Sequence, residues 1–160
     1  MQDVSKKIAV VGIGNLLRRD DGIGIIVLES LFEFYKRKDI DYFNFNSASF
    51  DLLYRIKSYD VVLLIDGINA GLDVGKLVIS ELKDIEYKID NSVTSTHEFN
   101  LKDIYDLSKS LGINTRIYVA GVQVGDTTFG EGLSDALKNK KKDIIKKISV
   151  FIGEILCSPD

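Results

Sequence analysis

Two adjacent aspartates stand out in the segment VGIGNLLRRDDGIG at residues 11–24. The segment has the pattern of a strand end, a Gly-x-Gly turn and a helix start. Such turns often bind phosphate, but this one lacks the third glycine of the dinucleotide fingerprint and the Gly-Lys-Ser/Thr of a P-loop. Asp20 and Asp21 would also repel a phosphate. A helix cap is a common use of aspartate, yet it explains one carboxylate better than two.

Two further residues have side chains suited to chemistry. Asp66 directly follows a run of apolar strand residues in DVVLLIDGINAG. It either starts an Asp-Gly turn or faces the ligand crevice beyond a strand. His97 is the only histidine and lies in the polar stretch SVTSTHEFN, an expected loop before a helix. A lone histidine is more often a surface or core residue than a ligand, but loops on a rigid scaffold frequently carry function.

Asp21, Asp66 and His97 together offer two carboxylates and one imidazole. This set suits zinc, nickel or a similar divalent ion, with a position left open for water or substrate. Each residue is expected at or near the same edge of a sheet, where the three could meet. Glu98 is expected to be a solvent-facing neighbour of His97. The sequence shows no Ser/His/Asp arrangement, and Cys157 in the C-terminal tail is a poor candidate for a nucleophile.

The elements that must position these residues alternate between strands and helices. We expect strands at 7–13, 41–46, 60–66, 76–82 and 116–124, and helices at 21–36, 49–59, 100–112 and 133–156. This alternation predicts a three-layer α/β fold, in which a mostly parallel five-stranded sheet carries helices on both faces. Ligands of such folds bind beyond the carboxyl ends of the strands, which is where the candidate residues fall.

Composition narrows the class of protein. The 160 residues predict a single domain over 1–160, and the net charge of -3 argues against a general nucleic-acid binder. No apolar stretch reaches the roughly 20 residues that span a membrane, and no signal peptide is recognisable. We therefore expect a cytoplasmic protein without membrane association. A single cysteine excludes an internal disulfide, and we expect a monomer because no extra interface segment stands out.

The segment GIGNLLRRDDGIG resembles the signature Gly-x-Gly-Asn-x-Leu-x-x-Asp-(Asp/Glu)-Gly-x-Gly of the hydrogenase maturation proteases. That family also has an aspartate at the end of a central strand, similar to Asp66, and a histidine in a Ser/Thr-containing loop, similar to His97. The resemblance covers nearly the whole chain. One departure is visible after the last expected strand. Many members have Gly-(Val/Ile)-(Glu/Gln)-Pro there, whereas this chain has GVQV, and we expect Val124 in place of proline to alter the following loop.

The resemblance implies an aspartic-type endopeptidase that removes a short C-terminal extension from the large-subunit precursor of a nickel-iron hydrogenase. It implies that Asp21, Asp66 and His97 bind nickel that the precursor supplies, so that cleavage follows nickel insertion. Zinc or cadmium could act as a surrogate for nickel. Asp20 would be the structural member of its pair. We take Asp21 as the general base, because it stands on the tight turn beside the first strand.

Two other interpretations stay open at this point. The chain could be a zinc-dependent hydrolase of another substrate, which would hold zinc tightly and in stoichiometric amount. It could also be a non-catalytic, flavodoxin-like ligand-binding module, which would bind nucleotide or flavin and no metal. The missing phosphate motifs count against the second interpretation.

Overall fold

The computed structural model describes residues 6–46, 49–88, 94–95 and 101–158. Five strands form a continuous sheet in the order β2-β1-β3-β6-β4, and a short strand, β5, pairs with the end of β3. Neighbouring strands among β2, β1, β3 and β6 run parallel, whereas β4 is antiparallel to β6. The strands are β1 (Ile8–Ile13), β2 (Ile40–Phe45), β3 (Val61–Asn69), β4 (Leu77–Glu81), β5 (Thr94–Ser95) and β6 (Arg116–Gln123).

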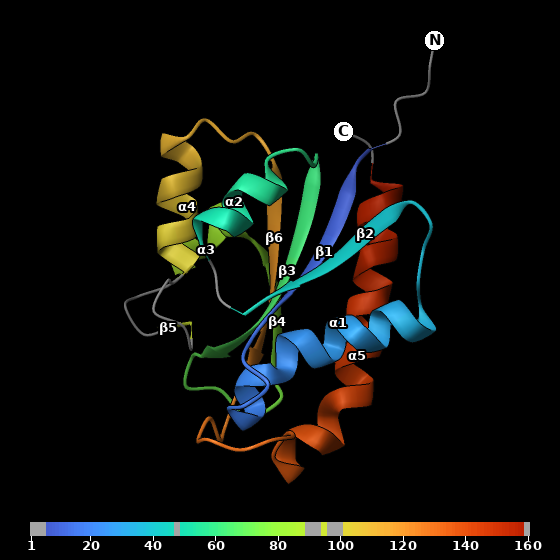
Figure 1. Ribbon diagram of the computed structural model, residues 1–160, viewed down its shortest axis with the longest axis vertical. Helices are drawn as coiled ribbons and strands as arrows, with labels where there is room; N and C mark the ends of the chain where they lie inside the picture. Colours follow the sequence, from blue (N-terminus) through green and yellow to red (C-terminus); the bar gives the residue numbers. More distant parts are fainter. Residues whose placement is uncertain (1–5, 47–48, 89–93, 96–100, 159–160) are drawn as a thin grey trace.

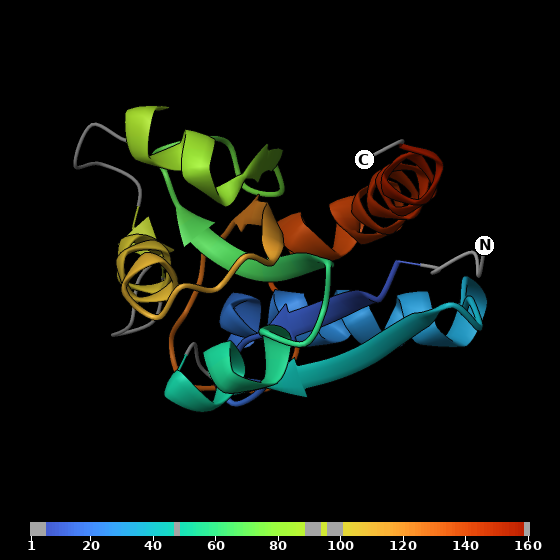
Figure 2. The same ribbon diagram turned by 90° about the horizontal axis from the view of Figure 1, so that it is seen from above.

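Helices cover both faces of this sheet. They are the 3-10 helix η1 (Arg19–Gly22), α1 (Ile23–Phe34), α2 (Phe50–Ile56), α3 (Leu82–Lys88), α4 (Leu101–Ser110) and α5 (Asp135–Cys157). Figures 1 and 2 both show α5 on one side of the sheet and α4 on the other. Within the described ranges, no helix combines the length and apolar character needed to cross a membrane.

Strand periodicity sorts the core into two clusters. In β1, Ile8 and Val10 pack in the cluster with α1 and α5, whereas Ala9, Val11 and Ile13 pack in the cluster with α2 and α4. Successive side chains of a strand point to opposite faces, so a strand covered on both faces must be apolar throughout. This requirement explains the uninterrupted apolar runs in the sequence. The predicted three-layer fold with a mostly parallel five-stranded sheet is confirmed.

Several local predictions hold and others are wrong. Ser49 caps α2, as its position predicts, by accepting a hydrogen bond from the N–H of Leu52. The expected end of the central strand at Asp66 is wrong, because β3 continues to Asn69. Pairing with β6 persists from Asp66 opposite Gly121 onward, and this partner overrides the turn tendency of Asp-Gly. Helix α3 and strand β5 were not predicted.

Glycines allow α1 to lie directly on the sheet. A Cβ atom on Gly24 would overlap the carbonyl oxygens of Ile13 and Ile65. A Cβ atom on Gly12 would lie 2.5 Å from the carbonyl oxygen of Gly24. The helix backbone therefore meets the ends of β1 and β3 with no side chain between them. This close approach brings η1 to the carboxyl edge of the sheet.

Gly24→Ala should lower the free energy of unfolding by about 3 kcal/mol, because the backbone must shift to admit the methyl group. Urea denaturation measures this change. Gly153→Ala is the matched control, since no described atom other than those of its chain neighbours and the adjacent backbone of α5 lies within 4 Å of the place its Cβ would take. Better helix propensity should make that variant more stable by about 1 kcal/mol. Equal effects of the two substitutions would contradict the packing account.

Candidate functional site

Asp20 is fully buried, and its carboxylate accepts four hydrogen bonds. The N–H of Ser134 donates to Oδ1 at 2.7 Å. Oδ2 accepts from the N–H groups of Gly125 and Asp126, each at 3.0 Å, and from the Ser134 hydroxyl at 2.8 Å. Such donors replace the water that a buried carboxylate loses. Asp20 thereby ties the loop at 125–134 and the start of α5 to the turn after β1, which is a structural role.

Backbone contacts hold the same two loops together. The N–H of Arg19 donates to the carbonyl of Gly130 at 2.9 Å, and the N–H of Gly130 donates to the carbonyl of Leu17 at 2.8 Å. These bonds keep Arg19 at a φ of 44°, in the left-handed region that only glycine adopts freely. Hydrogen bonds from the hydroxyl and N–H of Thr128 lower the pKa of Asp126. Asp126 therefore stays ionised at neutral pH, 3.4 Å from the guanidinium of Arg19.

Asp21 lies in η1 and is 2% exposed. Its N–H donates to the carbonyl of Arg18 at 3.0 Å, and its carbonyl accepts from the N–H of Asn15 at 3.2 Å. The N-cap residue of α1 is Gly22, and no side chain among the described residues caps this helix. The helix-cap interpretation of Asp20 and Asp21 is therefore wrong.

Asp66 lies inside β3 and is 1% exposed. Its neighbour Ile65 pairs with Gly12 near the end of β1. On the other side of Asp66, a Cβ atom on Gly67 would lie 3.5 Å from Ile23 and 3.7 Å from the carbonyl oxygen of Asp20. The start of α1 therefore rests on the stretch of β3 that contains Asp66. The structure brings the segments of Asp21 and Asp66 together at one edge of the sheet.

His97 and Glu98 lie outside the described residues. The nearest described residue before them is Ser95, which pairs with Ile68 of β3, two positions beyond Asp66. Within the described ranges, no three His, Cys, Asp or Glu side chains form a group that could hold a metal ion. A complete ligand set at this edge would need a side chain from outside the described ranges, and His97 stays the predicted one.

Comparison with known proteins decides the family. The model of the family "Hydrogenase maturation protease", HycI, matches residues 25–150. This chain belongs to the hydrogenase maturation protease family. Members of the family are peptidases, so the chain is a hydrolase rather than a non-catalytic binding module.

Relatives of this family extend the match to more than nine tenths of the chain. A Methanocaldococcus jannaschii protein, provisionally named a hydrogenase maturation protease, is 33% identical and aligns over 94% of this chain and 90% of its own length. The crystal structure of the nickel-iron hydrogenase maturation protease HycI from Thermococcus kodakarensis has a TM-score of 0.72 at 26% identity, covering 94% of this chain and 95% of that one. The Escherichia coli endopeptidase HybD shares the fold, with a TM-score of 0.78 at 19% identity and coverage of 92% and 93%.

Val124 follows the last parallel strand, β6, at the position where the family pattern given in the sequence analysis has proline. Its N–H donates to the carbonyl of Ile68 at 3.1 Å. A proline could not make this bond, because its nitrogen carries no hydrogen. In this member of the family, valine therefore continues the contact between β6 and β3 by one hydrogen bond.

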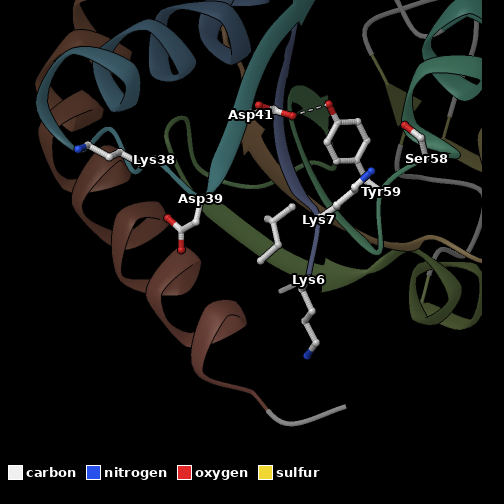
Figure 3. A pocket seen from close by; sticks show the side chains of 8 residues that line it. Lys6, Lys7, Lys38, Asp39, Asp41, Ser58 and Tyr59 are labelled. Carbon is white, nitrogen blue, oxygen red and sulfur yellow. Dashed lines mark hydrogen bonds between the residues drawn. The ribbon is translucent and has the colours of Figure 1, made fainter. Parts of the chain in front are cut away.

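A separate hollow of about 310 Å³ lies near the amino ends of β1, β2 and β3 (Figure 3). Asp21 and Asp66 do not line it. Burial raises the pKa of Tyr59, and so does the hydrogen bond that its hydroxyl donates to Asp41 at 2.8 Å. Basic and acidic side chains both line this hollow, namely those of Lys6, Lys7, Lys38, Asp39 and Asp41. It contains none of the residues that the family resemblance implicates.

Ser134 and Gln123 are site-edge residues that the sequence analysis did not identify. Ser134 precedes the apolar periodicity of α5, and its hydroxyl accepts from the N–H of Leu137, so an N-cap signal was present. Gln123 is the last residue of β6 and is buried. Its polar side chain after an apolar strand was the available signal.

Asp20→Asn should lower the free energy of unfolding by about 2–4 kcal/mol. Backbone donors face both carboxylate oxygens of Asp20, so the amide group of asparagine would meet an N–H on at least one side. Thermal or urea denaturation measures the loss. Asp135→Asn is the control, because that side chain is 98% exposed. A stability loss no larger for Asp20→Asn than for Asp135→Asn would contradict the structural role of Asp20.

Proposed function

We propose that this peptidase removes the C-terminal extension of a nickel-iron hydrogenase large-subunit precursor after nickel has been inserted. Nickel is then part of the substrate, and Asp21, Asp66 and His97 complete its coordination. The family assignment supports the reaction class, and the Thermococcus kodakarensis relative HycI is a maturation protease of nickel-iron hydrogenase. Zinc or cadmium would act as a surrogate for nickel at the same ligands.

Burial of Asp21 and Asp66 is the observation that carries this proposal. Among the described residues, the buried side chains with a formal charge are Asp20, Asp21 and Asp66, and all belong to one edge of the sheet. Asp20 has a structural explanation in its four hydrogen bonds. A second and third buried carboxylate add a large desolvation cost, which a divalent cation offsets. A cation that arrives with the substrate would therefore find a site of matching charge.

The ligand chemistry also fits the reaction. Carboxylate and imidazole groups bind nickel and zinc well, and they leave coordination positions open for the groups of a second molecule. A divalent ion polarises a carbonyl and lowers the pKa of a bound water toward about 7. Hydrolysis then needs no nucleophilic serine or cysteine. Asp21 would accept the proton of the attacking water, and the leaving amine would take up a proton as the peptide bond breaks.

Ligands from two molecules would make cleavage depend on nickel loading. An unloaded precursor offers Asp21, Asp66 and His97 no cation, so its tail would not be held against the base. The peptidase would thereby cleave only precursors in which nickel insertion is complete.

The proposal predicts a specific change of mass. We expect the purified protein to remove a short C-terminal peptide from nickel-loaded precursor and to leave nickel-free precursor intact, as read by intact-mass spectrometry. Asp21→Asn and His97→Ala should slow cleavage by about 100-fold or more, because each removes a ligand and Asp21→Asn also removes the base.

Asp135→Asn, exposed at the start of α5, should cleave at the wild-type rate. An unchanged mass after incubation with precursor of verified nickel content would refute the proposed reaction. If Asp21→Asn binds loaded precursor and still cleaves it, Asp21 is not the base. Cleavage of loaded and nickel-free precursor at equal rates would show that nickel is not recognised.

A further inference from the structure

Gln123 carries a buried amide with four hydrogen bonds at the end of β6, and it is 4% exposed. Its Oε1 accepts from the N–H of Ala70 at 2.7 Å and from the N–H of Leu72 at 3.2 Å. Its Nε2 donates to the carbonyl of Val124 at 2.8 Å and to Oδ1 of Asn69 at 3.3 Å. Asn69 is the last residue of β3, the strand that contains Asp66, and Ala70 and Leu72 follow directly in the loop after it.

The backbone of Gln123 holds the other end of the same loop. Its N–H donates to the carbonyl of Lys76 at 2.9 Å, and its carbonyl accepts from the N–H of Gly75 at 2.8 Å. One residue therefore fixes both the beginning and the end of the loop between β3 and β4.

This loop borders the candidate site. A Cβ atom on Gly125 would lie 2.9 Å from Val74 of the loop, so Val74 packs against Gly125. The N–H of Gly125 in turn donates to Asp20. At the loop's beginning, Asn69 pairs with Thr94 of β5. The amide of Gln123 is thus connected to the Asp20 carboxylate through the peptide unit of Val124 and Gly125, whose carbonyl accepts from Gln123 and whose N–H donates to Asp20. It is connected to the paired end of β3 through Asn69.

Packing alone does not require an amide at this position. An apolar side chain of similar size would fill the space without the desolvation cost of a buried polar group. Four directed hydrogen bonds fix position as well as volume. We propose that Gln123 is a positioning residue, which sets the β3–β4 loop and the end of β3 so that Asp66 meets the nickel of the precursor. This inference rests on the proposed function.

Two substitutions distinguish the effect of the hydrogen bonds of Gln123 from the effect of its side-chain volume. Gln123→Met keeps a side chain of similar length and removes all four hydrogen bonds. Gln123→Glu keeps an oxygen that accepts from Ala70 and Leu72. With nickel-loaded precursor, we expect kcat of Gln123→Met to fall by about tenfold or more while KM changes by less than about threefold, because the ligand geometry changes and not the docking surface. Gln123→Glu should regain part of the lost kcat.

Thr115→Val is the matched control, because Thr115 stands just before β6 at the opposite end of that strand. The single proton of the Thr115 hydroxyl is shared between the carbonyls of Ile56 and Tyr59, at 3.1 and 2.8 Å, so removal of the hydroxyl also deletes hydrogen bonding from a side chain to the backbone. We expect kcat and KM of this variant to equal those of the wild type, even where its stability falls.

Amide hydrogen exchange gives a second readout on the protein alone. The N–H groups of Ala70 and Leu72 should exchange about tenfold faster or more in Gln123→Met than in the wild type. The same two groups should exchange at the wild-type rate in Thr115→Val. Equal exchange in Gln123→Met and the wild type would overturn the inference without any use of the precursor.

Failure of this inference can be told apart from failure of the proposed function. Wild-type protein that leaves loaded precursor uncleaved would overturn both. Wild-type cleavage together with an unchanged kcat in folded Gln123→Met would overturn the positioning role alone. An equal loss of kcat in Thr115→Val would also overturn it, because general destabilisation would then explain the effect.

Discussion

The buried carboxylate of Asp20 is the interaction on which the carboxyl edge of this molecule depends. Its hydrogen-bond donors come from residues 105 to 114 positions later in the chain. A charge removed from water needs hydrogen-bond donors at close range. If the turn after β1 and the loop at 125–134 separated, the Asp20 carboxylate would lose its donors. The loop at 125–134 and the start of α5 are therefore fixed beside Asp21. The candidate site takes its shape from this constraint.

Two adjacent carboxylates occur in a turn that resembles a phosphate-binding turn, and different roles for Asp20 and Asp21 explain this. Asp20 accepts four hydrogen bonds within the protein, and Asp21 is proposed to meet a cation that the substrate brings. The glycines that let α1 lie on β1 and β3 place both residues at the edge where Asp66 is buried. Gln123 is proposed to act in the same way from the other side, by fixing the chain beyond Asp66. Local packing thus gathers the buried carboxylates of the described residues at one edge of the sheet.

Sequence patterns predicted what depends on neighbours in the chain. Apolar runs gave the strands of the parallel sheet, and Ser49 marked the start of α2 by its capping preference. Features that depend on distant partners were missed. β3 extends past Asp66 because β6 continues beside it, and β5 forms because the end of β3 offers free hydrogen-bonding positions to a later segment. The antiparallel direction of β4 and the hydrogen bond from Val124 to Ile68 also depend on partners that are distant in the sequence.

The candidate site shows the same limit. Asp21 and Asp66 could be named from a motif and a strand end, and the structure brings their segments together. The separate role of Asp20 came from the family resemblance, and its four donors explain it physically. No local pattern pointed to the contacts of Gln123, because three of the four partners of its amide, Asn69, Ala70 and Leu72, lie more than 50 residues away in the chain. The participation of His97 stays a prediction.

The central claim is that Asp21, Asp66 and His97 form one cation site, and the single histidine of the chain makes it directly testable. Zinc(II), a diamagnetic surrogate for nickel, would be titrated into the isolated protein while NMR follows the imidazole signals of His97. The account predicts a stoichiometric shift in the wild type and in Asp135→Asn, with affinity at least about tenfold weaker in Asp21→Asn and Asp66→Asn. A His97 signal that zinc does not move, or that moves equally in all four proteins, would contradict it.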